Sequence, residues 1–168
     1  MRPPPAFPAA PLDRPTRLVT LAGIVVLVLG FPLLLLRGAE PLAGAAFGAI
    51  VALLVVGAWA VGPAGYDVSD GRLAVRRRGP GRRTFRLTGT IKRAPADLGL
   101  GVRLGPTGGL FGWSGFFWRA GLGRYRAYMT DRSCLVACTT DAGLVVVSPA
   151  DPDAFIRAAR RAQRKAAS

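Results

Sequence analysis

Two long apolar runs come first along the chain, and alternating apolar and polar positions follow them. Residues 18–36 contain no charged side chain over 19 positions, and residues 41–66 contain none over 26. Neither run has the polar face that a helix at the surface of a soluble protein carries. Nineteen residues at about 1.5 Å each extend about 28 Å as a helix, close to the roughly 30 Å hydrocarbon core of a bilayer. The pattern therefore predicts two membrane-spanning helices, over about 18–36 and 41–62.

The link between the two runs is short and polar. Residues 37–40 carry one Arg and one Glu, and Pro41 suits the first position of the second helix. We therefore expect a transmembrane hairpin over residues 18–65. Two alternatives stay open: a helical pair buried inside a soluble protein, and a signal peptide that is cleaved near "AGA" at 43–45. After such a cleavage the second run would still anchor the chain.

Basic side chains lie at the ends of the runs that face away from the link. They are Arg2, Arg14 and Arg17 before the first run, and Arg72, Arg76, Arg77 and Arg78 after the second. Basic flanks favour the cytoplasmic side. We therefore expect a multi-pass protein of the inner (plasma) membrane with both termini in the cytoplasm. Trp59 and Tyr66, near the inner end of the second helix, are expected to anchor it at the membrane interface.

Residues 1–17 hold six of the fourteen prolines. This composition is typical of a disordered or polyproline-like tail. A flexible leader and a ligand for a proline-recognition domain are the two interpretations.

From residue 66 onward the apolar positions alternate with a period of two, which predicts β-strands. Asp70-Gly71 lies between two such segments and indicates a tight hairpin, because this dipeptide accepts positive φ. Residues 84–92 alternate in the same way. Three short segments, at 123–130, 133–140 and 143–148, predict an antiparallel meander.

The period becomes helical after residue 150. Asp151 suits the N-cap, Pro152 suits the first turn, and Phe155 begins an apolar stripe, which predicts a helix over about 151–165. Six or seven strands and this helix within residues 66–168 predict a small, partly open β-barrel or two packed sheets covered by the helix. The fold class is thus a membrane-anchored α+β protein.

Two segments carry a resemblance to a known family. They are "GGLFGWSGFFWRAGLGRYRAYMTD" at 108–131 and "VVVSPADPDAF" at 145–155. The chain resembles the bacterial pleckstrin-homology-like (PH-like) family, in particular small membrane proteins with an N-terminal two-helix hairpin. The resemblance implies a PH-like β domain that is closed by a C-terminal helix. It implies no reaction; PH domains in general present basic loops to anionic lipids or bind protein partners.

The charge of the chain is strongly positive, with 23 Lys and Arg against nine Asp and Glu. Residues 66–168 hold 19 of these basic residues against seven Asp and no Glu, a net +12. The candidate contacts for anionic lipid are the basic residues that follow the second helix most closely: Arg76, Arg77, Arg78, Arg82 and Arg83. A solvated surface without a ligand is the alternative. We expect no nucleic-acid partner, because a base-stacking strand motif is missing and a membrane tether restricts access.

Aromatic residues are concentrated in "FGWSGFFWR" at 111–119. The candidates for an interface with a partner or with lipid are Trp113, Phe116, Phe117 and Trp118. Core packing on a bulged strand is the alternative, since the interleaved glycines permit close approach of the backbone. Burial of all the aromatic side chains in this segment would exclude the interface.

The sequence offers no arrangement for catalysis or metal binding. The chain has no His and two Cys, Cys134 and Cys138, so neither a nucleophile–His pair nor a zinc site is expected. Four residues apart on a strand is too far for a disulfide, and we expect the two thiols to pack in a reducing compartment. The resulting hypothesis is a non-enzymatic integral membrane protein without a cofactor. It would present a cytoplasmic PH-like domain for protein interaction or for contact with anionic lipid.

The expected partners are membrane lipids and an unidentified protein. Gly44 and Gly48, four apart in the second run, also allow a homo-oligomer through the transmembrane helices. The alternative function is a membrane sensor or regulatory subunit that binds a small apolar or lipid ligand inside the β domain.

Overall fold

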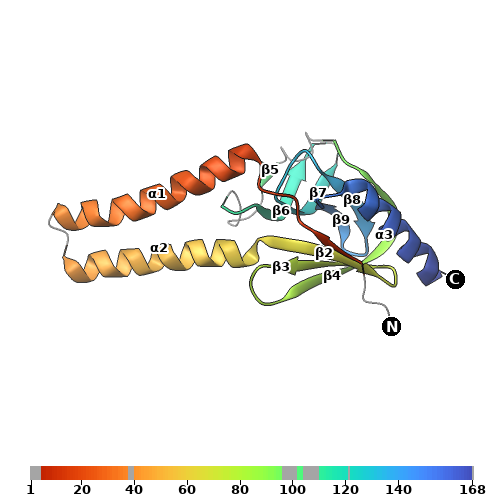
Figure 1. The fold of residues 1–168 in the computed structure, drawn as a ribbon, viewed down its shortest axis with the longest axis horizontal. Helices are drawn as coiled ribbons and strands as arrows, with labels where there is room; N and C mark the ends of the chain where they lie inside the picture. The colour runs from red at the N-terminus through yellow and green to blue at the C-terminus, as the bar shows by residue number, and fades with distance from the viewer. Residues whose placement is uncertain (1–4, 38–39, 96–101, 104–109, 121, 168) are drawn as a thin grey trace.

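A helical hairpin projects from one end of a β domain, and a C-terminal helix lies on the domain away from the hairpin (Figure 1). The computed structural model describes residues 5–37, 40–95, 102–103, 110–120 and 122–167. The hairpin consists of α1 (Arg14–Leu36) and α2 (Pro41–Val61), and the C-terminal helix is α3 (Pro152–Ala167).

The described strands form one nine-stranded sheet that curls around a core. They are β1 (Ala6–Pro8), β2 (Pro63–Ser69), β3 (Arg72–Arg77), β4 (Arg82–Arg93), β5 (Val102–Arg103), β6 (Trp113–Arg119), β7 (Gly123–Met129), β8 (Val136–Thr140) and β9 (Gly143–Val147). Their order across the sheet is β1-β2-β3-β4-β8-β9-β7-β6-β5. The PH-like β-sheet domain with a C-terminal helix that the sequence predicted is thus consistent with the structure.

The first hairpin of the domain follows its local signal. Ser69 pairs with Arg72, so the loop between β2 and β3 is Asp70-Gly71, and both loop residues have positive φ, of 46° and 69°. A two-residue loop with this backbone matches the twist of the strands it joins.

The meander predicted for the last three strands is wrong. β8 and β9 form an antiparallel hairpin, but β9 also pairs with β7, in parallel. β8 instead uses its other edge to pair with β4 at Leu87–Arg93. The chain therefore crosses over between β7 and β8, which a local pattern of alternation does not specify.

Two apolar clusters lie on the two faces of the strands β7 and β9. The larger one joins the inner faces of β2, β3 and β4 to α3, whose Phe155 and Ala159 are fully buried. Phe155 meets the rings of Phe7 and Tyr66 at edge-on angles. The smaller cluster contains Phe117, Tyr125, Ala127, Met129, Leu135 and Val146.

The start of α3 is as the sequence predicted. The N–H of Ala154 donates to Oδ1 of Asp151 at 2.9 Å, which caps the first turn. Arg93 of β4 forms two hydrogen bonds with the carboxylate of Asp153, at 2.9 and 2.7 Å. Further along α3, the Arg160 guanidinium donates to the Ile91 carbonyl, which holds the helix across β4.

The prediction of a disordered tail over 1–17 is wrong from residue 5 onward. β1 pairs with β2 as the edge strand, and the N–H of Ala10 donates to the Ser148 carbonyl at 2.9 Å. Proline is compatible with an edge strand, where its missing N–H interrupts no ladder. α1 also begins at Arg14, four residues earlier than predicted.

The two helices of the hairpin differ in how well they meet the requirements for crossing a membrane. In the part of the chain that the structure describes, one helix, α2, is long and apolar enough to cross a bilayer, judged by its length and composition. The crossing predicted for α1 stays a prediction.

Candidate functional site

The base of the hairpin is fixed to the β domain by polar contacts. We call this region, formed by Asp13, Thr16, Thr20, Arg78 and Arg132 with their partners, the junction. At the start of α1, Asp13 accepts a hydrogen bond from the N–H of Thr16 at 2.9 Å and an ion pair from Nε of Arg132 at 3.0 Å. Its own N–H donates to the Thr130 carbonyl at 3.1 Å. Burial opposes ionisation of Asp13, but the hydrogen bonds from Thr16 and Arg132 outweigh it and lower the pKa of this carboxyl.

Two threonines on α1 bind the aromatic segment of the domain. The indole N–H of Trp113 donates to Oγ1 of Thr16 at 3.0 Å, and the N–H of Phe111 donates to Oγ1 of Thr20 at 3.1 Å. Both threonines are buried. Neither threonine was among the predicted site residues, although two hydroxyl side chains four apart at the start of an apolar helix lie on one face and are a readable signal.

The turn between β3 and β4 packs on the end of α2. The N–H of Arg78 donates to the Gly62 carbonyl at 3.0 Å, and the N–H of Gly79 donates to the Ala60 carbonyl at 2.9 Å. The Arg78 side chain then reaches the Phe111 carbonyl at 3.1 Å. Arg78 therefore links α2 to the segment that is bound to α1.

The five candidate lipid-contacting arginines have different environments. Arg76 and Arg82 pair with one carboxylate, that of Asp67, at 3.2 Å each. These two contacts account for Asp67, whose side chain is largely buried. Arg77 and Arg78 are half-buried beside α2, whereas Arg83 is exposed and faces a cavity described below.

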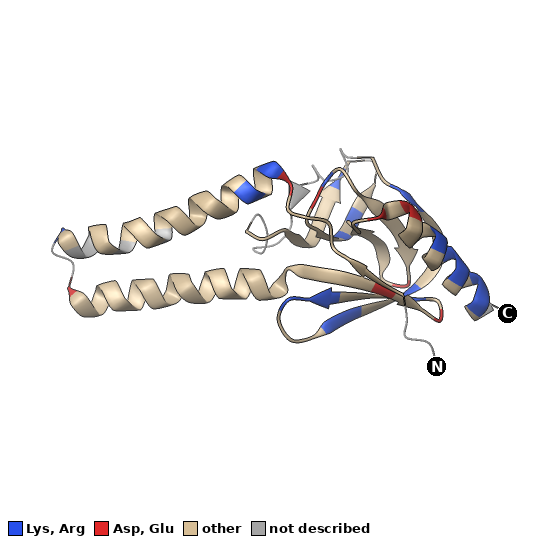
Figure 2. Ribbon diagram, in the orientation of Figure 1, with Lys and Arg blue, Asp and Glu red and all other residues tan. Residues whose placement is uncertain are grey.

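Besides arginines on other strands, such as Arg124 and Arg126 of β7, positive charge forms two separate groups in the described chain (Figure 2). One surrounds the junction and the β3–β4 hairpin; the other runs along α3 away from the helical hairpin. The helices between their ends carry no charge. The basic residues of α3 therefore do not belong to the group beside α2.

The four aromatic candidates differ in burial. Phe117 is fully buried in the smaller core, so its prediction as an interface residue is wrong; alternation along β6 directs it inward. Phe116 and Trp118 lie on the opposite face and are each 43% exposed. Trp113 is half-buried at the junction.

Tyr66 is not an interface anchor, and this prediction is wrong. α2 ends at Val61, and the chain enters β2 at Pro63, so Tyr66 lies in the core of the β domain with no exposed surface. Its hydroxyl donates to the Tyr128 carbonyl at 2.7 Å and accepts from the Ser148 N–H, and burial raises its pKa to about 12. Trp59, in the last turn of α2, is 46% exposed, and its anchoring role stays a prediction.

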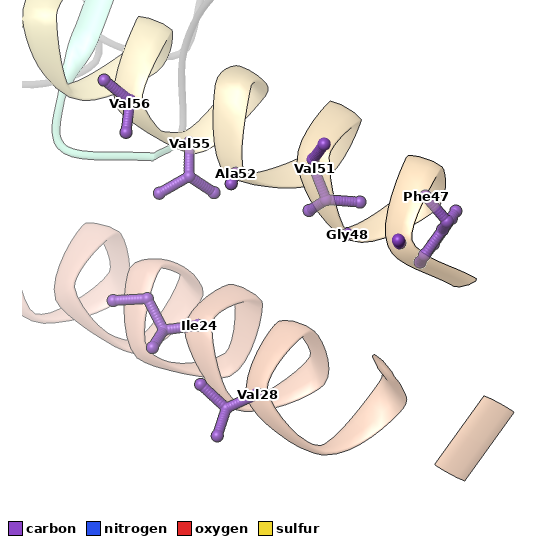
Figure 3. A pocket seen from close by; sticks show the side chains of 10 residues that line it. Ile24, Val28, Phe47, Gly48, Val51, Ala52, Val55 and Val56 are labelled. Atoms are coloured by element: carbon purple, nitrogen blue, oxygen red, sulfur yellow. The ribbon is translucent and has the colours of Figure 1, made fainter. Parts of the chain in front are cut away.

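An apolar groove of about 710 Å³ separates the two helices (Figure 3). Ile24 and Val28 line it from α1, and Phe47, Val51 and Val55 line it from α2. Gly48 also lines the groove, whereas Gly44 is buried.

A second cavity, of about 300 Å³, lies within the β domain. Its lining comes from β4, β6, β7 and the β8–β9 turn and includes Arg83, Phe85, Phe116, Arg126, Tyr128 and Asp141. Charged and hydroxyl side chains make it unlike the apolar pocket that the sensor hypothesis expects.

The two cysteines are free, and Cys138 is buried in the larger apolar cluster. Burial raises the pKa of its thiol to about 12. Among the described residues, no group of three or more His, Cys, Asp or Glu side chains is placed to hold a metal ion.

Residues 84–163 match the family model described as Bacterial PH domain. The matched segment extends from β4 into α3, and it supports a bacterial PH-like domain in this part of the chain. No curated protein and no solved structure matches the chain. The match does not include the helical hairpin or the strands β1, β2 and β3.

Proposed function

We propose that this chain is a non-enzymatic integral membrane protein that holds a PH-like domain against the cytoplasmic face of the inner membrane. PH-like domains are modules for interaction with proteins or lipids, and the family match supports such a module here. In this proposal α1 and α2 both cross the bilayer, and the domain binds a protein partner or anionic headgroups.

The junction is the observation that carries the proposal. Large apolar side chains are exposed along both helices, including Leu29 and Leu53. Polar contacts at Asp13, Thr16 and Arg78 hold the domain directly at the base of these helices. Exposed apolar surface of this extent requires cover, and lipid provides it without any further protein.

Contact with anionic lipid would follow from the position of the basic residues. Arg77 and Arg78 lie beside the end of α2, and Arg14 and Arg17 are exposed in the first turn of α1. A basic residue near an anionic leaflet contributes about 1 kcal/mol. Arg76 and Arg82 already pair with Asp67. We therefore assign lipid contact chiefly to Arg14, Arg17, Arg77 and Arg78. This contact would orient a domain that the helices already anchor.

Accessibility of single cysteines tests the topology. In a Cys134→Ser, Cys138→Ala background, Glu40→Cys places a thiol in the turn between α1 and α2, and Thr88→Cys places one on the exposed face of β4. We expect a membrane-impermeant maleimide to label the first in intact spheroplasts and the second only after permeabilisation. Labelling of Thr88→Cys in intact spheroplasts, or recovery of the chain in the aqueous fraction, would overturn the proposal.

The protein partner is tested separately. Mild crosslinking in native membranes, followed by purification of the full chain, should recover the same protein in replicate preparations. A matched chain with Phe116→Ser and Trp118→Ser should lose it if the exposed aromatics of β6 form the interface. Recovery of no reproducible protein would remove the protein-interaction role and leave lipid contact.

A further inference from the structure

The cavity in the β domain contains cationic groups on core-facing positions. Side chains alternate between the two faces of a strand, and on β7 Tyr128 belongs to the larger core cluster. Arg126, two residues earlier, lies on the same face and lines the cavity. On β4, Phe85 belongs to the same core, and Arg83 precedes it by two residues and also lines the cavity.

Arg126 is held in place by aromatic rings. Its guanidinium carbon lies 5.6 Å from the centroid of Phe85 and 5.0 Å from that of Phe116. Such contacts are cation–π attractions that use none of the five N–H groups of the guanidinium as conventional hydrogen-bond donors, so these remain for an oxyanion. Within the described residues, neither Arg126 nor Arg83 forms an ion pair.

Among the described residues that line the cavity, Asp141 is the one acidic side chain, and a hydrogen bond fixes its position. Oδ1 of Asp141 accepts the N–H of Arg86 at 3.0 Å, which holds the β8–β9 turn against β4. Two arginines against one aspartate leave the lining with a formal charge of +1. The cavity therefore favours an anion.

The lining favours a phosphate group over a carboxylate. The two guanidinium groups come from different strands, and Tyr128 and Thr84 add hydroxyl-bearing side chains to the lining. A phosphate monoester has three terminal oxygens and a charge of about −1.5 to −2 at neutral pH, so it can satisfy donors that arrive from several directions.

The wall of the cavity continues as an aromatic surface. Phe116 lines the cavity, and Trp118 follows it on the same face of β6; both are partly exposed. The volume, about 300 Å³, is at the lower end of small-molecule sites and suits a headgroup more than a whole amphiphile. An organic substituent would therefore leave the cavity along these rings.

We propose that this cavity binds a phosphate monoester with an apolar substituent, with the phosphate between Arg83 and Arg126 and the substituent along Phe116 and Trp118. Either a soluble aryl or alkyl phosphate or a lipid with a monoester headgroup, phosphatidate, has this chemistry. Apart from Arg83, the site uses none of the basic residues around the β3–β4 turn. It stands independently of the membrane topology, and it would give the domain a ligand-sensing role.

Isothermal titration calorimetry of the full chain in uncharged detergent micelles tests the site by measuring the affinity of each ligand. The probes are phenyl phosphate, inorganic phosphate and dihexanoyl phosphatidate, with dihexanoyl phosphatidylcholine as the phosphodiester control. Binding of phenyl phosphate at least about tenfold more tightly than inorganic phosphate is expected. A further gain of about tenfold for phosphatidate over phenyl phosphate would identify the lipid as the source, and equal affinities would identify a soluble ligand.

The arginines of β7 provide a matched pair of variants. Arg126→Gln removes the charge inside the cavity and should weaken phenyl phosphate by about tenfold or more. Arg124→Gln removes a charge that also lies over Phe116, at 5.7 Å, from a residue outside the lining, and should change affinity less than about twofold. Arg83→Gln, at an exposed position, provides the same test if Arg126→Gln does not fold.

Three outcomes would overturn the proposal. They are the lack of measurable heat with phenyl phosphate and with phosphatidate at millimolar concentration, equal losses in Arg124→Gln and Arg126→Gln, and binding of phosphatidylcholine as tight as that of phosphatidate. None of them bears on the cysteine-labelling result, so the site and the membrane topology are judged separately.

Discussion

The indole of Trp113 and the hydroxyl of Thr16 lie 3.0 Å apart across 97 positions of sequence. This hydrogen bond joins the first residue of β6 to the first turn of α1. With the Phe111–Thr20 bond beside it, the domain is fixed to the hairpin by side chains as well as by the chain itself. These contacts attach α1 to β6, which forms one wall of the cavity that we assign to a phosphate ligand.

Loss of this bond should lower stability by a measurable amount. Thr16→Val and Trp113→Phe each remove one partner, and a part-buried hydrogen bond of this kind contributes about 1 kcal/mol. Trp113→Phe also loses contact with the ring of Phe117 and with Arg132. The coupling energy in a double-mutant cycle isolates the bond, and we expect about 1 kcal/mol from urea unfolding of the full chain in micelles.

Thr139→Val is the matched control, because Thr139 is exposed on β8. It should change the free energy of unfolding by less than about 0.5 kcal/mol and show no coupling to Trp113→Phe. Strictly additive losses for Thr16→Val and Trp113→Phe would show that the two side chains act independently.

The β3–β4 turn should detach from α2 when a side chain is added at Gly79. A Cβ built there would lie 2.7 Å from the Cβ of Ala60, a distance that requires a shift of the backbone. We expect Gly79→Val to cost about 1–3 kcal/mol. The amides of Arg78 and Gly79, which donate to Gly62 and Ala60, should then exchange with deuterium faster.

Gly57→Ala on α2 serves as the control, since nothing lies within 4 Å of the added Cβ. Its exchange pattern at the turn should equal that of the parent chain. Unchanged protection in Gly79→Val would mean that the turn is not held by these contacts.

The sequence determines the locally encoded parts of this fold. Asp70-Gly71 fixes the β2–β3 hairpin, and Asp151 with Pro152 fixes the start of α3, because each signal acts on its own neighbours in the chain. The pairing of β7 with β9 has no such signal. It depends on contacts between segments far apart in the chain, since β4 pairs with the β8 edge of the β8–β9 hairpin and β7 with the β9 edge.

The end of α2 shows why the site was only partly predictable. The uncharged run continues to Tyr66, so the absence of charge predicted that Tyr66 lies at the membrane interface. In the structure, Gly62 and Pro63 end the helix before Tyr66. Lipid contact by the basic residues that follow α2 stays a prediction. The pairing of Arg76 and Arg82 with Asp67 could not be predicted, because it requires the register of β2, β3 and β4.

Acid should weaken the junction through Asp13. Its pKa is lowered in the folded chain, so its ionised form contributes stability that is fully present above the unfolded value of about 4 and is lost as the pH falls through the folded value. The difference in stability between the parent chain and Asp13→Asn should therefore be constant from about pH 7 to 5. It should shrink below about pH 4, as measured by urea unfolding at each pH. A difference that does not vary down to pH 3 would contradict the assignment.

Asp67 should stabilise the domain because its carboxylate offsets the repulsion between two arginines that are cross-strand partners. Arg76 pairs with Arg82 in the ladder, and both guanidinium groups lie 3.2 Å from the Asp67 carboxylate. Asp67→Asn leaves the two like charges side by side. The arginines are about half-exposed, so water screens them, and we expect a loss of about 1–2 kcal/mol that decreases with added salt.

Two further variants show whether that loss belongs to the charge pair. Asp70→Asn removes a carboxylate from the adjacent β2–β3 turn, where Asn accepts positive φ, and should change stability by less than about 0.5 kcal/mol. Arg76→Gln should cost less than Asp67→Asn, because Arg82 keeps its partner and no repulsion between the two remains. If Asp67→Asn and Asp70→Asn have equal effects at low salt, Asp67 acts only through the net charge of the domain. The positions of Arg76 and Arg82 would then be set by the pairing of β3 with β4 and not by Asp67.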